Sequence, residues 1–357
     1  MTSLPTVKPS AVSRPAFLAA VAASGIGPTA RELVELLDDL PPHSPVAVAA
    51  HQLVVRGALT RFQADHLLAG KTAGLALGPY LLLEPVGEED GGRLFRARHR
   101  VMDRLVGVWV SAADNPGRAA RLTAAHDAAR LAHPHVLTVL DVHPHAARPY
   151  VVTEYVDGAG LDEVVRLAGR LPVGRACDLL RQVALGLAHA HERGVGHGRL
   201  TAESVRVGRP GGGGPEGRMV VKLAGFAGGP ADGRTVCTDL LAFGRLAAHL
   251  FAGKPNVPVP AGLPPAVAGL VADLLNANPY RRPAAALVAE RLAPFADAGA
   301  ESPADITCPF ADMVGDQPTD ACAVTRAVEI GRRPRLAAVG VVVAVGLFTA
   351  ALVAAML

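Results

Sequence analysis

The chain reads Gly194-Val195-Gly196-His197-Gly198-Arg199-Leu200-Thr201-Ala202-Glu203-Ser204 at the point that decides its fold. Two valine-rich runs follow it, Val205–Val207 and Met219–Leu223, on either side of the glycine-rich run Pro210–Pro215. This pattern predicts a β-hairpin with a long loop between its strands. A phosphate-binding role for the glycine run is not favoured, because no helix begins directly after it to supply amide groups. We therefore expect a polar loop that leads into a hairpin.

The frame of this loop resembles the catalytic loop of protein kinases, which reads H-R-D-L-K-P-E-N. His197, Leu200 and Glu203 match that frame. Other segments resemble further parts of the same family in the same order: Gly78–Gly87 (first strand and glycine-rich loop), Ala132–Leu137 (after the regulatory helix), Tyr150–Gly158 (fifth strand and hinge), Asp239–Gly244 (the long buried helix) and Pro279–Pro283 (a turn near the domain end). The chain is thus similar to bacterial, planctomycete-like serine/threonine kinases.

The resemblance implies an α+β, two-lobed protein-kinase-like fold over residues 78–296. The smaller lobe is expected at about 78–156 and the larger one at about 157–296. Residues 1–14 are expected to be disordered. A small all-α unit is predicted at 15–72, where Thr29–Glu32 and Thr60–Gln63 both fit capping boxes that open helices. Its function is not legible from the sequence.

The end of the chain is predicted to be a membrane anchor. Residues 336–357 contain no charged side chain, and as a helix they would span roughly 33 Å, enough for a hydrocarbon core of about 30 Å. Arg332, Arg333 and Arg335 precede them, so the positive-inside rule leaves the N-terminal domains in the cytoplasm. The alternative, a buried core helix, is weaker because the run has no polar face. Residues 297–335, rich in Asp, Pro, Gly and Ala, are predicted to be a flexible juxtamembrane linker. We expect a single-pass protein of the bacterial cytoplasmic membrane.

Three positions of the catalytic centre depart from the family pattern. Arg199 stands where the family has the aspartate that accepts the substrate proton, and a cation cannot accept it. Ser204 replaces the asparagine that holds a magnesium ion, and Gly225 replaces the aspartate of the D-F-G motif. These positions offer a hard dication no carboxylate oxygen, so no metal site is expected.

The phosphate-binding lysine and its partner are replaced as well. Trp109 stands at the lysine of the third strand, and Ala124 stands at the paired glutamate of the regulatory helix. Strand alternation places Trp109 on the same face as Gly107, toward the nucleotide cleft, so we expect the indole to occupy space that phosphates would need. Arg93 or Arg96 on the second strand is an alternative source of a cation.

The glycine-rich loop keeps its first and last glycine but carries Glu88, Glu89 and Asp90 at its tip. Three carboxylates there would repel a triphosphate, since the distances are shorter than a Debye length of about 8–10 Å. We therefore expect ATP and magnesium binding to be absent or weak, with no cofactor. The remnant of the nucleotide cleft comprises Gly87, Gly92, Trp109, Glu154 and Val156.

The residues that match the family are structural. His197 and Phe226 resemble members of the hydrophobic stack that joins the lobes, and Asp239 resembles the buried carboxylate that binds the backbone of the catalytic loop. Arg282 resembles an arginine that pairs with a glutamate of the activation segment. Only about a dozen residues separate Ala227 from Asp239, so that partner is missing and the segment is short.

Composition bounds the remaining choices. Hydrophobic residues make up 50% of the 357 residues, enough for a buried core, and the net charge is only +3. No run of basic residues with interleaved aromatics appears, so no nucleic-acid binding is expected. The cysteines, Cys177, Cys237, Cys308 and Cys322, have no zinc-binding spacing and are interpreted as reduced thiols.

Three functions remain open at this point. The first, which we favour, is a membrane-anchored pseudokinase that is not an enzyme and acts as a signalling scaffold or allosteric regulator of protein partners, such as active kinases or their substrates. The second is a weakly active or atypical ATP-binding protein kinase. The third is a binder of a small molecule or a phosphopeptide that uses Arg199 in the cleft.

Overall fold

The structure is a computed structural model, and it describes residues 12–210, 220–255 and 261–296. The described residues fall into two compact units that divide after Gly70. The predicted linker at 297–335 and the predicted membrane helix at 336–357 lie outside the described residues, as do Cys308, Cys322 and most of the N-terminal segment 1–14.

The N-terminal unit contains four described helices, α1 (Arg14–Ser24), α2 (Ala30–Leu36), α3 (Val46–Val55) and α4 (Arg61–Leu68). Both predicted capping boxes are confirmed. The hydroxyl of Thr29 accepts the amide of Glu32, whose carboxylate accepts the amide of Thr29 at 2.7 Å, and Thr60 and Gln63 form the same pair of bonds. These reciprocal bonds satisfy amide groups that have no partner inside the helix.

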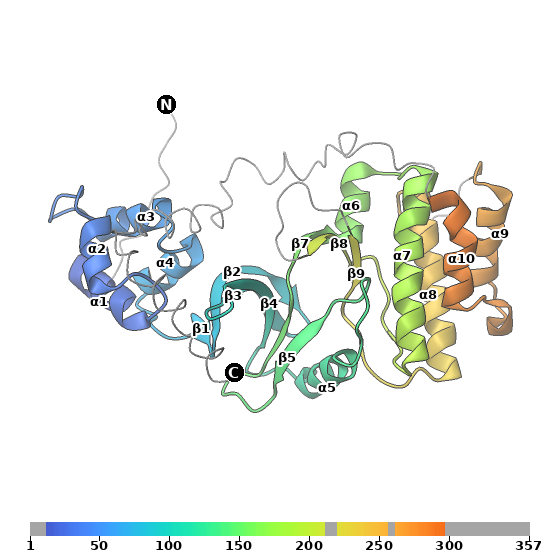
Figure 1. Cartoon of the computed structure of the whole chain (residues 1–357), viewed down its shortest axis with the longest axis horizontal. Helices are drawn as coiled ribbons and strands as arrows, with labels where there is room; N and C mark the ends of the chain where they lie inside the picture. The colour runs from blue at the N-terminus through green and yellow to red at the C-terminus, as the bar shows by residue number, and fades with distance from the viewer. Residues whose placement is uncertain (1–11, 211–219, 256–260, 297–357) are drawn as a thin grey trace, which may run out of the picture. The chain divides into compact units, whose positions relative to one another are not determined.

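The second unit begins with an antiparallel sheet in the order β1-β2-β3-β4-β6-β5. Its strands are β1 (Ala76–Leu77), β2 (Tyr80–Glu89), β3 (Gly92–His99), β4 (Arg104–Ser111), β5 (Val139–His143) and β6 (Tyr150–Glu154), and helix α5 (Arg118–Ala128) lies beside them (Figure 1). Trp109, Ala125 and Val151 form a small buried cluster between β4, α5 and β6. This cluster fixes α5 against the sheet.

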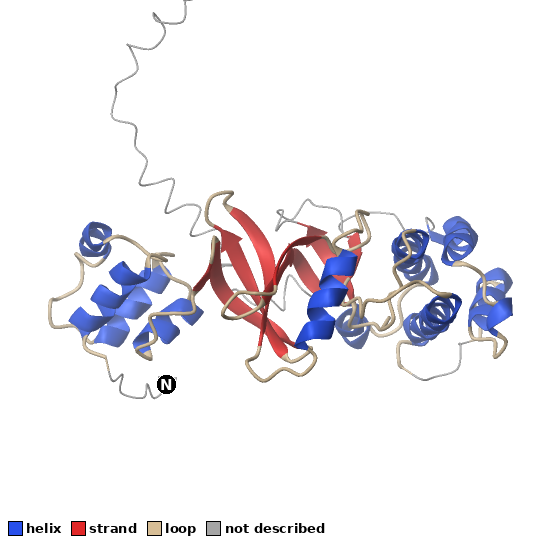
Figure 2. Cartoon of the chain, turned by 90° about the horizontal axis from the view of Figure 1, so that it is seen from below, coloured by secondary structure: helices blue, strands red, loops and turns tan. Residues whose placement is uncertain are grey.

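The rest of this unit is a small sheet and a group of helices (Figure 2). The sheet has the order β7-β8-β9, and β8 pairs with β9 from Val205 opposite Leu223, which confirms the predicted hairpin. The elements are β7 (Val156–Gly160), α6 (Leu161–Ala168), α7 (Val173–Glu192), β8 (Val205–Pro210), β9 (Val220–Leu223), α8 (Gly233–Ala252), α9 (Pro265–Leu274), the 3-10 helix η1 (Pro279–Arg281) and α10 (Ala285–Ala296). The predicted α+β arrangement of a sheet-rich and a helical lobe is confirmed.

Helices α7 and α8 form the core of the helical lobe. Cys177, Leu180 and Leu187 of α7 are buried in the same cluster as Phe243 and Phe251 of α8. Within the described ranges, α8 is the one helix long and apolar enough to cross a membrane, and half of its most apolar window is buried. Its packing in the cluster accounts for that hydropathy, because core helices of globular domains are apolar for the same reason.

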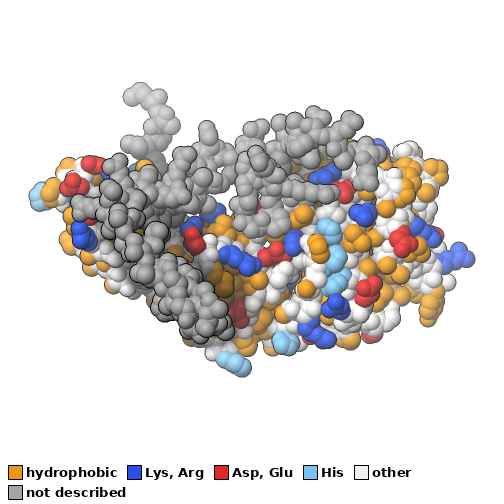
Figure 3. Space-filling view, in the orientation of Figure 1, with side chains coloured by type: hydrophobic (Ala, Val, Ile, Leu, Met, Phe, Trp, Pro, Cys, Tyr) orange, Lys and Arg blue, Asp and Glu red, His pale blue; other side chains and the backbone are white. Residues whose placement is uncertain are grey.

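Charged side chains are mixed over the surface that Figure 3 shows, where basic and acidic groups of the described residues lie among one another. Such an arrangement differs from the single-sign basic face that binds nucleic acid. The sequence-based expectation of no nucleic-acid binding stays a prediction.

Candidate functional site

A cavity of about 390 Å³ lies between the two lobes of the second unit. Its wall includes strands β2 to β4, helix α5, the connection between β6 and β7, and the loop 199–204. Of the five residues predicted to form the remnant cleft, Trp109, Glu154 and Val156 line this cavity, whereas Gly87 and Gly92 do not. Arg199, Ser204 and Gly225 also line it, so the structure brings most of the predicted positions together.

Trp109 forms part of the wall and does not fill the cavity. Its side chain is 2% exposed and packs against Ala125 and Val151, while its Nε1–H donates to the carbonyl of Glu89 at 2.9 Å. A Cβ atom on Gly92 would lie 2.5 Å from the indole, so only glycine allows this close approach. The indole thus packs beneath the β2–β3 turn with the cavity beside it, and the expectation that it occupies space that phosphates would need stays a prediction.

The acidic tip of the β2–β3 turn is neutralised by arginines. Glu88 pairs with Arg93 at 2.6 Å, and Glu89 accepts from Nη2 of Arg121 at 3.0 Å. The guanidinium of Arg121 also lies 5.6 Å from the centre of the Trp109 ring, in a cation–π contact. The predicted repulsion of a triphosphate did not take these ion pairs into account, and weak or absent ATP binding stays a prediction.

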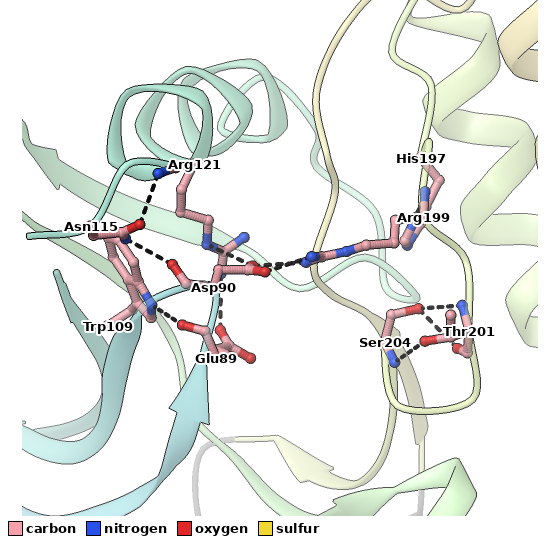
Figure 4. Close-up of polar contacts among 10 residues, drawn as sticks. Glu89, Asp90, Trp109, Asn115, Arg121, His197, Arg199, Thr201 and Ser204 are labelled. Carbon is pink, nitrogen blue, oxygen red and sulfur yellow. Dashed lines mark hydrogen bonds and ion pairs between the residues drawn. The ribbon is translucent and has the colours of Figure 1, made fainter. Parts of the chain in front are cut away.

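Asp90, the third carboxylate of the turn, joins the two lobes. Its carboxylate accepts two bonds from Arg199, one of them 2.7 Å from Nη2 to Oδ2, and the same Oδ2 atom lies 3.6 Å from Nε of Arg121 (Figure 4). Asn115 holds the turn from behind by donating to the Asp90 carbonyl at 2.8 Å. The bond from Arg199 lowers the pKa of the Asp90 carboxyl, and the bond to Asp90 raises the pKa of Arg199.

This inter-lobe bridge is weak enough to open. The Arg199 side chain is 51% exposed and that of Asp90 is 21% exposed, so water screens the pair. Exposed ion pairs contribute about 0.2–1 kcal/mol, and a difference of 1 kcal/mol corresponds to roughly a fivefold ratio of populations. The bridge therefore joins the β2–β3 turn to the loop 199–204, and opening it costs little free energy.

The remaining departures from the family pattern serve local structure. Ser204 closes a turn with Thr201, because its Oγ accepts the Thr201 amide at 3.0 Å and donates to the Thr201 carbonyl at 2.9 Å. Gly225 has a φ of +70°, in the left-handed region. The described residues contain no group of three or more His, Cys, Asp or Glu side chains that could hold a metal ion. The expectation of no metal site stays a prediction.

Ala124 lies where α5 meets the segment after Phe226. It is buried, and a Cβ atom on Gly228 would lie 2.8 Å from its Cα. A side chain on Gly228 would collide with the backbone of this helix. The loss of the family's Lys–Glu pair therefore coincides with a direct backbone approach between α5 and residues 228–229, where the amide of Gly229 also lies 3.4 Å from the carboxylate of Asp127.

An ion pair lies at the rear of the cavity. Nζ of Lys222 on β9 donates to Oε1 of Glu154 at 2.7 Å, and the two side chains are 8% and 13% exposed. The same oxygen accepts the amide of Thr138 at 2.8 Å. Glu154 is thus a bound structural carboxylate at the end of β6, and its side chain is already used by protein donors.

The retained residues act as the resemblance implied. Asp239 accepts the amides of His197 and Gly198 at 2.9 and 2.8 Å and a bond from His191 at 2.9 Å. Burial opposes the charge on Asp239, but these bonds outweigh it and lower its pKa. Burial also lowers the pKa of His197 to about 4. The His197 ring lies 4.5 Å from that of Phe226. The loop 197–204 is therefore anchored to α8.

Arg282, whose family partner is missing, binds backbone instead. It donates to the carbonyl of Cys237 at 2.8 Å and to that of Asn276 at 3.0 and 3.2 Å. These bonds tie the start of α8 to the turn before η1. The arginine keeps a role in the fold with different partners.

Residues 92–227 match the family model described as protein tyrosine and serine/threonine kinase. This stretch of the chain is therefore similar to the domains of protein kinases. Serine/threonine-protein kinase PknD of Mycobacterium tuberculosis is 31% identical over 140 residues, which are 38% of this chain and 21% of that protein. Serine/threonine-protein kinase pkn2 of Myxococcus xanthus is 31% identical over 36% of this chain and 16% of its own length, and PrkC of Bacillus subtilis is 25% identical over 36% and 21%. The match thus spans about a fifth of these relatives.

These similarities correct one prediction. The kinase family model and the kinase relatives point to a kinase enzyme, which contradicts the expectation that the chain is not an enzyme. That expectation assumed that a chain lacking the family's own groups has no others to use. It took no account of Arg121 or of the cavity beside Trp109.

Sequence reasoning missed one residue of the site, Arg121, and one contact, that between Asp90 and Arg199. Arg93 and Arg96, the substitute cations considered, pair instead with Glu88 and Glu84. The cation that reaches the site is Arg121, three residues before Ala124 and so on the same face of α5. That spacing was a usable signal. No local sequence signal indicated the contact between Asp90 and Arg199, which lie 109 residues apart.

Proposed function

We propose that residues 71–296 are an atypical serine/threonine protein kinase domain that binds a nucleotide in the inter-lobe cavity and transfers phosphate slowly. The observation that supports this most directly is the cavity of about 390 Å³ between the hinge and the catalytic loop, in a chain whose relatives are protein kinases. Cavities that bind small ligands measure roughly 300–1,000 Å³.

The rate is expected to be low because Arg199 cannot accept the proton of the substrate hydroxyl. A positioned general base contributes roughly 10²–10⁴-fold, and kinases of this family turn over at about 1–100 s⁻¹. We therefore expect turnover between about 10⁻⁴ and 1 s⁻¹. Positioning and charge stabilisation remain available, since phosphoryl transfer depends mainly on these and Arg121 and Arg199 supply positive charge at the cavity.

The test is transfer of radiolabelled phosphate from ATP by the purified full chain to a generic serine/threonine substrate. Ala224→Phe, which places a ring in the cavity, should abolish incorporation. Val101→Ser, on an 86% exposed side chain of the β3–β4 turn, should leave it unchanged. Incorporation that persists in Ala224→Phe would come from a contaminating kinase and would refute the proposal, as would no incorporation above background.

A second candidate function is a signalling scaffold or allosteric regulator of protein partners, such as active kinases or their substrates. It is supported by the Asp90–Arg199 ion pair, which links the two lobes without a ligand and so holds the surface that they form together in one arrangement. The test is co-purification of a serine/threonine kinase from the same organism with the wild-type chain and with Arg199→Gln. Loss of the partner in the variant is expected, and equal recovery with both would contradict this function.

We also propose that residues 336–357 anchor the chain in the bacterial cytoplasmic membrane as a single span, with the N-terminal domains in the cytoplasm. The uncharged sequence and the arginines before it support this. Deleting Leu336–Leu357 should move the protein from the membrane to the soluble fraction. A truncated chain that still sediments with membranes would disprove the anchor, and digestion of the kinase domain by protease outside intact cells would disprove the orientation.

A further inference from the structure

Two arginines from different elements converge on one oxygen atom. Oδ2 of Asp90 lies 2.7 Å from Nη2 of Arg199, in the catalytic loop, and 3.6 Å from Nε of Arg121, on α5 (Figure 4). Guanidinium groups that share an anionic oxygen in this way are suited to bind a phosphate, whose oxygens accept several charge-assisted bonds. Asp90 thus occupies a position that fits a phosphate group.

We propose that Arg121 and Arg199 form a binding site for the phosphate groups of a nucleotide in place of a divalent cation, and that Asp90 fills this site until the nucleotide displaces it. This inference rests on the proposed function, because it concerns the same cavity. It assigns the charge-neutralising role to residues that lie outside the family's lysine and D-F-G positions.

The cavity is continuous from the hinge to these arginines, since Glu154, Tyr155 and Val156 line it together with Arg121 and Arg199. One ligand with an apolar ring and a polyphosphate can therefore reach both ends. The apolar part of the wall includes side chains that suit a base: Val86, Leu94, Leu137, Val139 and Leu223.

The charges that face the site favour an anion once the turn lifts. Glu89 and Asp90 belong to the same turn, so both carboxylates leave Arg121 and Arg199 together. Glu203 remains near Arg199, and Arg206 lines the same cavity with the opposite charge. The guanidinium groups of Arg121 and Arg199 would then lack the carboxylates of the turn as counter-ions, and the phosphate groups of the nucleotide would take their place.

The test uses calorimetric titration of the full chain with inorganic tripolyphosphate in EDTA. Asp90→Asn removes the internal anion while asparagine tolerates the positive φ of 49° at this position, so it should bind tripolyphosphate about two- to sixfold more tightly than wild type. Arg121→Gln and Arg199→Gln should each bind at least tenfold more weakly. A tripolyphosphate affinity that Asp90→Asn does not raise would overturn the proposal.

A matched control exists on the next hairpin. Asp103 also has a positive φ, of 47°, and pairs with Arg98 at 3.0 Å. Asp103→Asn and Arg98→Gln should leave the affinity for tripolyphosphate unchanged. Equal effects of the control pair and the site pair would show nonspecific attraction by net charge and would refute the site.

Adenosine separates this inference from the proposed function. It should bind wild type and Arg199→Gln equally, because it has no phosphate. Tighter tripolyphosphate binding by Asp90→Asn with no phosphate transfer from ATP would support the site and defeat the proposed activity. Transfer from ATP with tripolyphosphate affinity insensitive to all three substitutions would support the activity and defeat the site.

Discussion

Replacing Trp109 tests whether the indole holds the β2–β3 turn or only fills space. Trp109→Ala removes a fully packed aromatic side chain, and such changes cost about 3–5 kcal/mol of unfolding free energy. Trp109→Phe keeps most of the packing against Ala125 and Val151 and loses the bond to the Glu89 carbonyl, worth about 0.5–1.5 kcal/mol. A weaker cation–π contact with Arg121 adds a loss of up to about 1 kcal/mol. We expect a total of about 0.5–2.5 kcal/mol for Trp109→Phe.

The assay is urea unfolding of the full chain followed by circular dichroism, combined with hydrogen exchange at the amides of residues 89–92. Both variants should speed exchange at this turn. Phe251→Ala, in the helical lobe and 1% exposed, provides a control that lowers global stability and leaves local exchange of the turn unchanged.

Two results would refute this reasoning. A loss below about 1 kcal/mol in Trp109→Ala would show that the indole is not packed as described. Unchanged exchange at residues 89–92 in Trp109→Phe would show that the bond to the Glu89 carbonyl does not hold the turn.

The remaining predictions concern buried charges and one glycine. Folding lowers the pKa of His197 from 6.5 to about 4, so between these pH values the unfolded state binds a proton that the folded state does not. The free energy of unfolding should therefore fall by about 3 kcal/mol as the pH is lowered from 6.5 to 4. Urea unfolding across this range measures the change, and a constant free energy of unfolding would contradict the prediction. Lys222→Met leaves the buried Glu154 carboxylate without its counter-ion and should lower the free energy of unfolding by about 3–5 kcal/mol. The double variant Lys222→Met/Glu154→Gln should regain most of that free energy in the same urea melts. Equal losses in the two variants would contradict the importance of the ion pair. Gly225→Asp should fold, because its Cβ would lie 3.6 Å or more from other atoms and aspartate is among the residues that tolerate a φ of +70°. Its carboxylate should compete with Asp90 for Arg199 and so speed hydrogen exchange at residues 89–92; exchange as slow as in wild type would contradict this.

Local signals in the sequence predicted the elements that depend on neighbouring residues. The capping boxes at Thr29 and Thr60 and the 205–223 hairpin require only short spacings, and the structure contains them. The backbone bonds of Asp239 agree with what the resemblance to protein kinases implied for this residue.

Contacts between distant segments could not be predicted in the same way. The ion pair between Asp90 and Arg199 was not predicted, because the two residues lie 109 positions apart and no local pattern links them. Likewise, alternation placed Trp109 correctly on the cleft side of β4, but only the tertiary structure shows that it packs down onto Ala125 and leaves a cavity. Side-chain direction follows from local rules, whereas the partner depends on the fold.

The contact between Ala124 and Gly228 has a consequence for how ionic strength acts on this domain. In kinases with the Lys–Glu pair, the seating of the regulatory helix depends on an attraction between charges. Here α5 packs so closely on residues 228–229 that a side chain on Gly228 would collide with Ala124, and van der Waals contacts are not screened by salt. The half-exposed Asp90–Arg199 bridge is screened. Added salt should therefore loosen the β2–β3 turn while α5 stays in place. Ionic strength alone can thus change one wall of the cavity without changing the other.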